Sequence, residues 1–411
     1  MGLACRVCPV RLWLLLLSLL LGLGAVSGAA IDWPAQEGKE AWDYVTVRKD
    51  AHMFWWLYYA TNPCKNFSEL PLVMWLQGGP GGSSTGFGNF EEIGPLDTHL
   101  KPRNTTWTVP FYIFSESYGG KMAAGISLEL HKAIQQGTIK CNFSGVALGD
   151  SWISPVGLAE VSEVAEQVLD AINKGFYKEA TQLWGKAETV IEKWTEKDSI
   201  RMASLFQNTD GVNFYNILTK STPETSMESS LEFLRSPLVR LCQRHVRHLQ
   251  GDTLSQLMNG PIRKKLKIIP EDCSWGADVE SVSDVAKADQ TQSSYVFISM
   301  EGDFMKPVIH IVDELLEAGV NVIVYNGQLD LIVDTMGQEA WLRKLKWPHL
   351  SKFNQLKWKA LYSNPESLET SAFVKSYKNL AFYWILRAGH MVPADQGAMA
   401  LKMLRLVTQQ E

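Results

Sequence analysis

The sequence predicts an α/β fold with a mixed, mainly parallel sheet, helices on both faces of the sheet and a helical cap insertion. Short apolar runs recur along the chain and alternate with longer stretches of helical periodicity. Strands that alternate with helices favour a parallel sheet that is covered on both faces. Residues 158–265 differ, because they are mostly helical in pattern and polar on one face. We interpret this middle stretch as an insertion that forms a cap.

The composition limits the class of protein. The chain has 411 residues, of which 46% are hydrophobic and 20% charged, which is enough for one large domain with an insertion or for two domains. The formal net charge is −5. A nucleic-acid partner would call for a basic balance, so that class is disfavoured. An acidic chain suits a protein that works in an acidic compartment.

Residues 1–29 have the layout of a cleavable signal peptide. Arg6 and Arg11 precede an apolar run from Leu12 to Leu23, and small residues follow. An uncleaved membrane anchor is the alternative, but the apolar run is short for a transmembrane helix. No later run of about twenty apolar residues exists, so we expect no stable membrane insertion. The expected location is the secretory pathway, with the chain either secreted or lysosomal.

The cysteines and glycosylation sequons agree with that compartment. Cys5 and Cys8 would leave with the signal peptide, and four cysteines would remain to form up to two disulfides with three possible connectivities. The sequence does not choose among the connectivities of Cys64, Cys141, Cys242 and Cys273. Three N-x-Ser/Thr sequons behind a signal peptide predict glycosylation, at Asn66, Asn104 and Asn142.

The expected elements follow in chain order. Residues 43–60 alternate and are rich in aromatic and β-branched types, which predicts an antiparallel strand pair. An amphipathic helix is expected around 308–318, and a helix follows the turn at 115–120 and runs to about 136. Buried strands are expected at residues 70–76, 109–114, 146–148, 321–325 and 380–386.

These elements divide the mature chain into three parts. We expect a first part of the α/β core at 30–157, the helical cap at 158–295 and the second part of the core at 296–411. Residues 276–294 are rich in Asp, Ser, Gln and Ala, which is typical of a loosely ordered surface loop.

Ser117 is the candidate nucleophile. The run Ser-Glu-Ser-Tyr-Gly at 115–119 departs from G-x-S-x-G only at its first position, and it lies between an expected strand and an expected helix. In α/β hydrolases the middle serine of this motif occupies a tight strand-to-helix turn, where small neighbours are needed. A chance match in an ordinary turn is the alternative, so the motif needs support from elsewhere in the chain.

A serine nucleophile needs a base, and the base needs an acid that orients it. In this fold the chain order is Ser, Asp, His. Asp330 follows the strand expected at 321–325, and His390 follows the last expected strand. Both lie where loops leave the carboxyl ends of strands, which is where sites form in such sheets. Asp334 is a rival for the acid.

The glycine-rich run from Gln77 to Ser84 closes the strand that ends at Leu76. Glycines let the backbone approach a substrate and direct N–H groups at it. We therefore expect this loop to supply one oxyanion-hole donor and the residue after the nucleophile to supply the other. A phosphate cradle is the competing interpretation, but no Gly-Lys-Ser/Thr follows.

The chain resembles the serine carboxypeptidase family. The family pattern W-L-N-G-G-P-G-C-S-S is similar to residues 75–84, G-E-S-Y-G-G to 115–120, and G-H-M-V-P to 389–393. The resemblance implies that Gly79 and Tyr118 supply the oxyanion-hole N–H groups. It also implies that the terminal carboxylate of the substrate is bound by Gln77, Gly78, Glu92 and Glu116.

A carboxylate-binding role for two acids has a physical consequence. Two carboxyl groups held close together cannot both ionise cheaply, so one keeps a proton and can donate a hydrogen bond to an anion. Such a site binds peptides best at acid pH. The alternatives are that Glu92 is an exposed loop residue and Glu116 a turn residue.

The chain departs from the family pattern in three ways. Gln77 replaces an asparagine, and Gly82 replaces a cysteine, so one family disulfide should be missing. The interval between Pro95 and Ser117 is too short for the strand, the glycine-rich segment and the helix that family members place there. We therefore expect internal deletions, including the loss of a sheet strand.

The function expected from these features is a serine-type carboxypeptidase that releases C-terminal amino acids from peptides through an acyl-enzyme, at acid pH. An esterase or acyltransferase on the same scaffold would use the same three residues without the carboxylate-binding set. An inert secreted isoform that lacks a core strand is the second alternative. We expect no cofactor and no metal, because the sequence contains no H-E-x-x-H arrangement and no C-x-x-C beyond the predicted signal peptide, in which Cys5 and Cys8 have that spacing.

Overall fold

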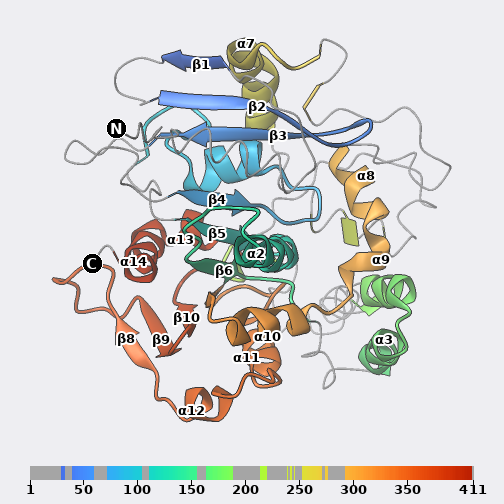
Figure 1. The fold of residues 1–411 in the computed structure, drawn as a ribbon, viewed down its shortest axis with the longest axis vertical. Helices are drawn as coiled ribbons and strands as arrows, with labels where there is room; N and C mark the ends of the chain where they lie inside the picture. Colours follow the sequence, from blue (N-terminus) through green and yellow to red (C-terminus); the bar gives the residue numbers. More distant parts are fainter. Residues whose placement is uncertain are drawn as a thin grey trace, which may run out of the picture.

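The computed structural model describes residues 29–32, 39–59, 72–103, 111–154, 163–187, 213–219, 238, 241–242, 245, 252–270, 274–275 and 292–409. Two sheets and a set of flanking helices make up this part of the chain (Figure 1). The predicted signal peptide, apart from its last residue, lies outside the described residues. So do Asn66, Asn104, Cys64 and Cys273.

The larger sheet has seven strands in the order β4-β5-β6-β7-β10-β9-β8. β4, β5, β6, β7 and β10 are parallel neighbours, and β9 and β8 complete the sheet with antiparallel pairing. The sheet is therefore mixed and mainly parallel, as predicted. Its strands are β4 (Val73–Leu76), β5 (Tyr112–Glu116), β6 (Gly145–Gly149), β7 (Asn321–Gly327), β8 (Lys359–Leu361), β9 (Ala372–Tyr377) and β10 (Leu380–Ile385).

The smaller sheet is antiparallel and contains β1 (Ala29–Asp32), β2 (Lys39–Arg48) and β3 (Ala51–Tyr58). It confirms the strand pair predicted at 43–60. Within the described residues no strand pairs with the outer edge of β4. A π-helical segment, η2 (Ser84–Ile93), lies between β4 and this hairpin (Figure 1).

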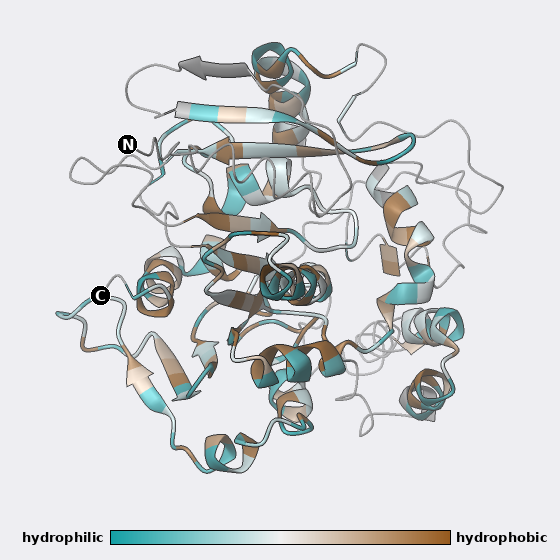
Figure 2. Cartoon of the chain, in the orientation of Figure 1, coloured by the Kyte–Doolittle hydropathy of each residue, from teal (hydrophilic) through white to brown (hydrophobic). Residues whose placement is uncertain are grey.

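Alternation along the strands creates two cores. In β5, Ile113 faces one side of the sheet, whereas Tyr112 and Phe114 face the other. The first core is covered by α2 (Gly119–Gln135), α10 (Ile309–Glu317) and α11 (Thr335–Leu342). The second is covered by α14 (Gly397–Val407). Figure 2 shows the central strands as mainly hydrophobic and the peripheral helices as mixed, as expected for a sheet covered on both faces.

The remaining helices lie around the sheet and in the middle of the chain. Among the described residues of the predicted cap, helical segments pack around a third core that includes Trp152, Val168 and Phe304. The predicted loop at 276–294 needs one correction, since a helix begins at Gln292. The further helices are α3 (Glu163–Asn173), α6 (Asp252–Leu257), η6 (Met258–Ile262), α7 (Arg263–Leu266), α8 (Gln292–Ser299), α9 (Glu301–Phe304), α12 (Leu350–Asn354) and α13 (Val392–Asp395).

Candidate active site

Ser117 occupies the turn between β5 and α2 in a strained conformation. Its φ angle is +58°, in the left-handed region that side chains other than glycine rarely adopt. The turn is crowded: a Cβ added at Gly78 would lie 2.6 Å from the Ser117 Cβ, so only glycine fits there. This strand–turn–helix geometry is that of the nucleophile elbow in α/β hydrolases. Ser115, which departs from the motif, is buried within β5 and donates to the Ala147 carbonyl.

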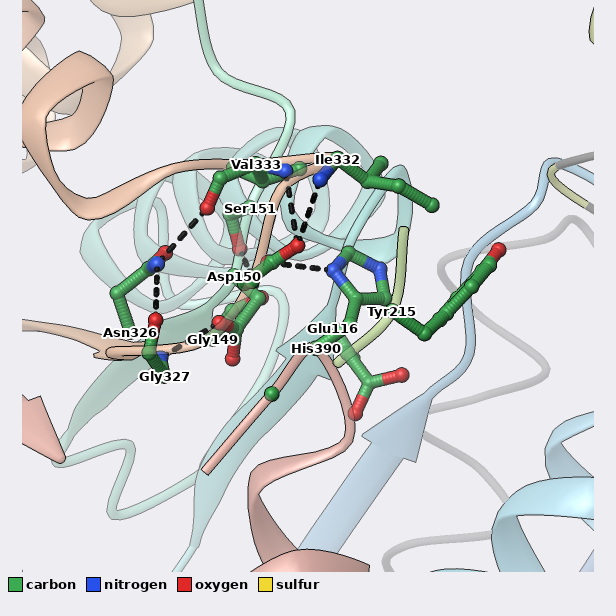
Figure 3. A network of polar contacts seen from close by, with 12 residues as sticks. Glu116, Gly149, Asp150, Ser151, Tyr215, Asn326, Gly327, Ile332, Val333 and His390 are labelled. Carbon is green, nitrogen blue, oxygen red and sulfur yellow. Dashed lines mark hydrogen bonds and ion pairs between the residues drawn. The ribbon is translucent and has the colours of Figure 1, made fainter. Parts of the chain in front are cut away.

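Asp330 and His390 form a buried pair on the loops that follow β7 and β10. The His390 Nδ1 lies 2.6 Å from the Asp330 Oδ2, and both side chains are almost fully buried. The Asp330 Oδ1 accepts two backbone hydrogen bonds, from the N–H groups of Ile332 (2.9 Å) and Val333 (3.0 Å). Figure 3 shows Ile332, Val333 and His390 around this site, with dashed lines for their contacts. The carboxylate is thus fixed by its own loop and orients the imidazole.

The rival acid Asp334 has a different place. Its side chain caps helix α11 and accepts a 2.7 Å hydrogen bond from the Gly337 N–H. The N-cap role satisfies one of the helix's free N–H groups. Of the two candidate acids, only Asp330 therefore reaches the imidazole of His390.

Ser117 and His390 line one pocket, together with Gln77, Gly78, Gly79, Glu116, Tyr215, His245 and Met391. No hydrogen bond joins the Ser117 hydroxyl to the imidazole among the described residues. Such bonds are often long in free enzymes and shorten when substrate binds. The shared pocket places nucleophile and base on the same cavity.

Two backbone N–H groups beside Ser117 are available to an oxyanion. Gly79 lines the pocket, and Tyr118 directly follows the nucleophile. Among the described residues, neither the Gly79 N–H nor the Tyr118 N–H has an acceptor. An oxyanion hole requires N–H groups that are free to bind the oxygen of the substrate.

The side chain of Tyr118 is held firmly by the region around α9. Its hydroxyl donates a 2.6 Å hydrogen bond to Asp303 Oδ2, and its ring stacks on Phe304 at 6.3 Å with an interplanar angle of 4°. Lys121 forms a 3.0 Å ion pair with the same carboxylate. These contacts fix the peptide that carries the Tyr118 N–H.

Glu92, Glu116 and Gln77 form a buried polar group beside the pocket. Glu92 and Glu116 are each 1% exposed, and the Gln77 side-chain amide donates to Glu116 Oε1 at 2.9 Å. Burial raises the pKa of Glu92 from 4.5 to about 7. Burial, together with the charge of Glu92, raises the pKa of Glu116 well above its ordinary value. Neither residue is the exposed loop or simple turn residue considered as an alternative.

Arg103 anchors the segment that carries Glu92. Arg103 donates to the backbone carbonyls of Phe90 (3.3 Å) and Glu92 (2.6 Å) at the end of η2. Among the described residues, neither Glu92 oxygen has a hydrogen bond of ordinary geometry, although the Glu116 and Gln77 side chains are close enough to act on its pKa. The carboxyl group of Glu92 is therefore held through its backbone and leaves its oxygens to Glu116 or to a ligand.

Three residues near the site were not predicted from the sequence. The backbone carbonyl of Tyr215 accepts from the His390 N–H at 2.7 Å, and its ring packs edge-on against the imidazole at 4.9 Å. His245 lines the pocket, and Asp150 lies buried next to Asp330 and His390. Asp150 follows the predicted strand at 146–148, so the rule that placed Asp330 could have found it. No sequence motif around Tyr215 or His245 indicates that these residues belong to the site.

The carboxyl groups of Asp150 and Asp330 and the ring of His390 come close enough together to hold a metal ion, with candidate ligand atoms within 4.8 Å of one another. However, Asp330 and His390 bind each other through the atoms that would face such an ion. The geometry therefore favours an acid–base relay over a metal site.

Fold and pocket together define the class: a serine hydrolase built on the α/β-hydrolase fold. The chain belongs to the serine carboxypeptidase family, since the family model described as "Serine carboxypeptidase" matches residues 31–109 and 103–410. The two matched segments meet at 103–109, within the interval that the sequence predicts to be shortened.

Named relatives agree with this assignment. The chain is 69% identical to the retinoid-inducible serine carboxypeptidase of Rattus norvegicus and 67% identical to that of Homo sapiens, each over 482 positions that cover 100% of both chains. Because this chain has 411 residues, the relatives contain segments without a counterpart here. Serine carboxypeptidase-like 51 of Arabidopsis thaliana is 37% identical, over 90% of this chain and 92% of its own.

A solved structure supports the fold. The crystal structure of Kex1(delta)p, a prohormone-processing carboxypeptidase from Saccharomyces cerevisiae, superimposes with a TM-score of 0.65 at 18% identity, covering 92% of this chain and 93% of the other. In the described part of this chain, the helices are too short or too polar to cross a membrane.

Proposed function

We propose that this chain is a serine-type carboxypeptidase that removes C-terminal amino acids from peptides at acid pH. The observation that carries the proposal is the buried pair Glu92 and Glu116, which lies with Gln77 beside the pocket of Ser117 and His390. A pair of carboxyl groups that shares a proton can donate a hydrogen bond to a carboxylate. Peptides with a free C-terminus are the substrates that present one.

The chemistry assigned to the pocket is acyl transfer. The Ser117 hydroxyl attacks the carbonyl of the last peptide bond while His390 takes its proton, and Asp330 orients the imidazole. The N–H groups of Gly79 and Tyr118 bind the oxyanion. His390 then gives the proton to the leaving amine, the C–N bond breaks and the terminal amino acid departs. Water attacks the acyl-enzyme with His390 again as the base, and Ser117 is regenerated.

The experiment compares a peptide that has a free C-terminus with the same peptide amidated, at pH 5 and pH 7.5. A fluorophosphonate probe measures the reactivity of Ser117 in parallel. We expect release of the C-terminal residue only from the free acid, more rapidly at pH 5, and a probe adduct on Ser117.

The chain offers a matched pair of serine variants. Ser117→Ala should abolish both release and labelling. Ser127→Ala removes a buried hydroxyl on α2 that does not line the pocket, and it should retain both. Equal cleavage of the amidated peptide would contradict the exopeptidase assignment and favour an esterase or endopeptidase. Absence of an adduct in folded protein would favour the inert isoform.

We also propose that the chain enters the secretory pathway and is glycosylated. The layout of residues 1–29 and the exposure of Asn142 support this proposal. Treatment of the secreted protein with an N-glycosidase should increase its gel mobility, and Asn142→Gln should remove part of that shift. Retention of an unglycosylated chain inside the cell would contradict the proposal.

A further inference from the structure

Asp150 is a third buried acid beside the Asp330–His390 pair. It follows β6, is fully buried and has a φ angle of +41°. Its backbone N–H donates to the Tyr325 carbonyl at 2.9 Å, and its Oδ1 accepts from the Gly327 N–H at 2.8 Å (Figure 3). These bonds hold its carboxyl group within 4.8 Å of candidate atoms on Asp330 and His390.

The hydrogen bonds of the two acids are unequal. Asp330 receives two backbone N–H groups and faces the His390 Nδ1. Asp150 receives only one N–H group, and its Oδ2 has no donor among the described residues. Hydrogen bonds to the charged form stabilise it, and two close carboxylates cannot both ionise cheaply. The negative charge therefore belongs on Asp330 and the proton on Asp150.

We propose that Asp150 is a positioning residue whose protonated carboxyl group donates a hydrogen bond to Asp330 and so sets how strongly Asp330 attracts the proton of His390. The inference rests on the proposed function, because it concerns the acid–base pair of that reaction. A neutral Asp150 leaves a single negative charge behind the imidazole. The extra donor also draws part of that charge away from the ring.

The other groups around Asp150 support a neutral form. Glu92 on η2 and Glu116 on β5 are acidic, and the charge of Asp150 also acts on Tyr325 on β7. The imidazole of His390 completes the set, and no lysine or arginine is among these groups. Burial, followed by the charge of Asp330, raises the pKa of Asp150 well above its ordinary value.

Two substitutions separate the protonated from the ionised form. In Asp150→Asn the amide can donate to Asp330 and accept from Gly327 without a charge. In Asp150→Gly the donor is lost, and glycine adopts the positive φ without strain. The pH titration of the downfield Nδ1–H resonance of His390 follows the imidazole in the whole protein, whether or not the serine is reactive.

We expect Asp150→Asn to titrate at the same pH as the wild type and to keep kcat on a small ester within about twofold. We expect Asp150→Gly to move the midpoint to higher pH by about 0.5 unit or more, because Asp330 then places its full charge on the ring. Its kcat should fall by about tenfold, consistent with the loss of a buried hydrogen bond to a charged group.

Two outcomes would overturn the proposal. A lower midpoint in Asp150→Asn would mean that Asp150 is ionised in the wild type. An unchanged midpoint in Asp150→Gly, with only a lower melting temperature, would limit Asp150 to holding its loop. Failure of the proposed function would instead appear as an unlabelled Ser117 in the wild type, and the titration would remain interpretable.

Discussion

The Gln77 side-chain amide donates a 2.9 Å hydrogen bond to the Glu116 carboxyl group, while the Gln77 carbonyl oxygen accepts from the Trp75 indole at 2.7 Å. The amide is therefore fixed at both ends. Gln77 is one methylene longer than the asparagine of the family pattern, and both ends of its side-chain amide have partners at this length. Glu116 Oε2 has no hydrogen bond of ordinary geometry among the described residues, and Glu116 lines the pocket.

Glu116→Ala should impair peptide hydrolysis and spare ester hydrolysis. Loss of a hydrogen bond to a charged group costs about 1.5–3 kcal/mol, so we expect KM for a peptide acid to rise by about 10- to 100-fold. A small ester lacks the terminal carboxylate and should keep its kcat/KM within about threefold. Steady-state kinetics with both substrates checks the prediction, and an equal loss on both would place Glu116 in the acyl-transfer step.

Peptide binding should weaken as the pH rises through about 7, where Glu92 releases its proton. Below that pH Glu92 is neutral and the pair can donate to the substrate carboxylate, whereas above it the ionised Glu92 repels the substrate. KM for a peptide acid, measured from pH 4.5 to 8, should therefore increase with pH. Glu92→Gln keeps a neutral donor and should flatten the curve. A flat curve in the wild type would count against the shared proton.

The stability of the fold, like peptide binding, should decrease as the pH rises. The folded chain keeps the Glu92 proton up to about pH 7, whereas the unfolded chain releases it near 4.5. The folded state thus binds more protons between these values, so the free energy of unfolding falls as the pH rises through this window. The melting temperature should be higher at pH 5 than at pH 7.5. Glu92→Gln should reduce this difference, which differential scanning calorimetry would measure.

Substitution of Asp330 should affect catalysis, whereas substitution of Asp334 should affect stability. Asp330→Asn disturbs the orientation of His390, and we expect kcat to drop by about 10³- to 10⁴-fold, with little change in the fold. Asp334→Ala removes the N-cap of α11 and should cost about 1 kcal/mol of stability while kcat is retained. Kinetics and denaturant unfolding of both variants provide the check. A large loss of kcat in Asp334→Ala would reverse the assignment.

The strands that carry the site could be predicted from the sequence because burial on both faces makes them continuous apolar runs. Tyr112–Glu116, Gly145–Gly149 and Asn321–Gly327 are fully or almost fully buried, so their pattern is unambiguous. β8 and β9 were not predicted. β8 has three residues, and β9 mixes Lys375 and Ser376 with apolar residues at the antiparallel side of the sheet.

For the site, chain order and position after strands indicated Asp330 and His390, and the structure joins them. Tyr215 and His245 could not be predicted, because they come from the middle of the chain and reach the pocket only through tertiary packing. The glycine-rich loop could be predicted as part of the site because glycine is needed where the backbone passes close to Ser117. The shortening before Ser117 was also predicted from the sequence. The family model agrees with it, because it matches in two segments that meet there.

The position of β4 at the edge of its sheet has a consequence for the loop that it carries. Within the part of the chain that the structure describes, backbone bonds join this strand to β5 alone, so side chains hold much of the loop beyond Leu76. Ser84 receives the Gln77 N–H at 3.0 Å, and the Trp75 indole holds the Gln77 amide. A single substitution can remove a hydrogen bond made by a side chain, whereas most substitutions leave the backbone hydrogen bonds of a strand in place. Sequence drift in relatives with the same shortening should therefore be slowest at Trp75, Gln77 and Ser84.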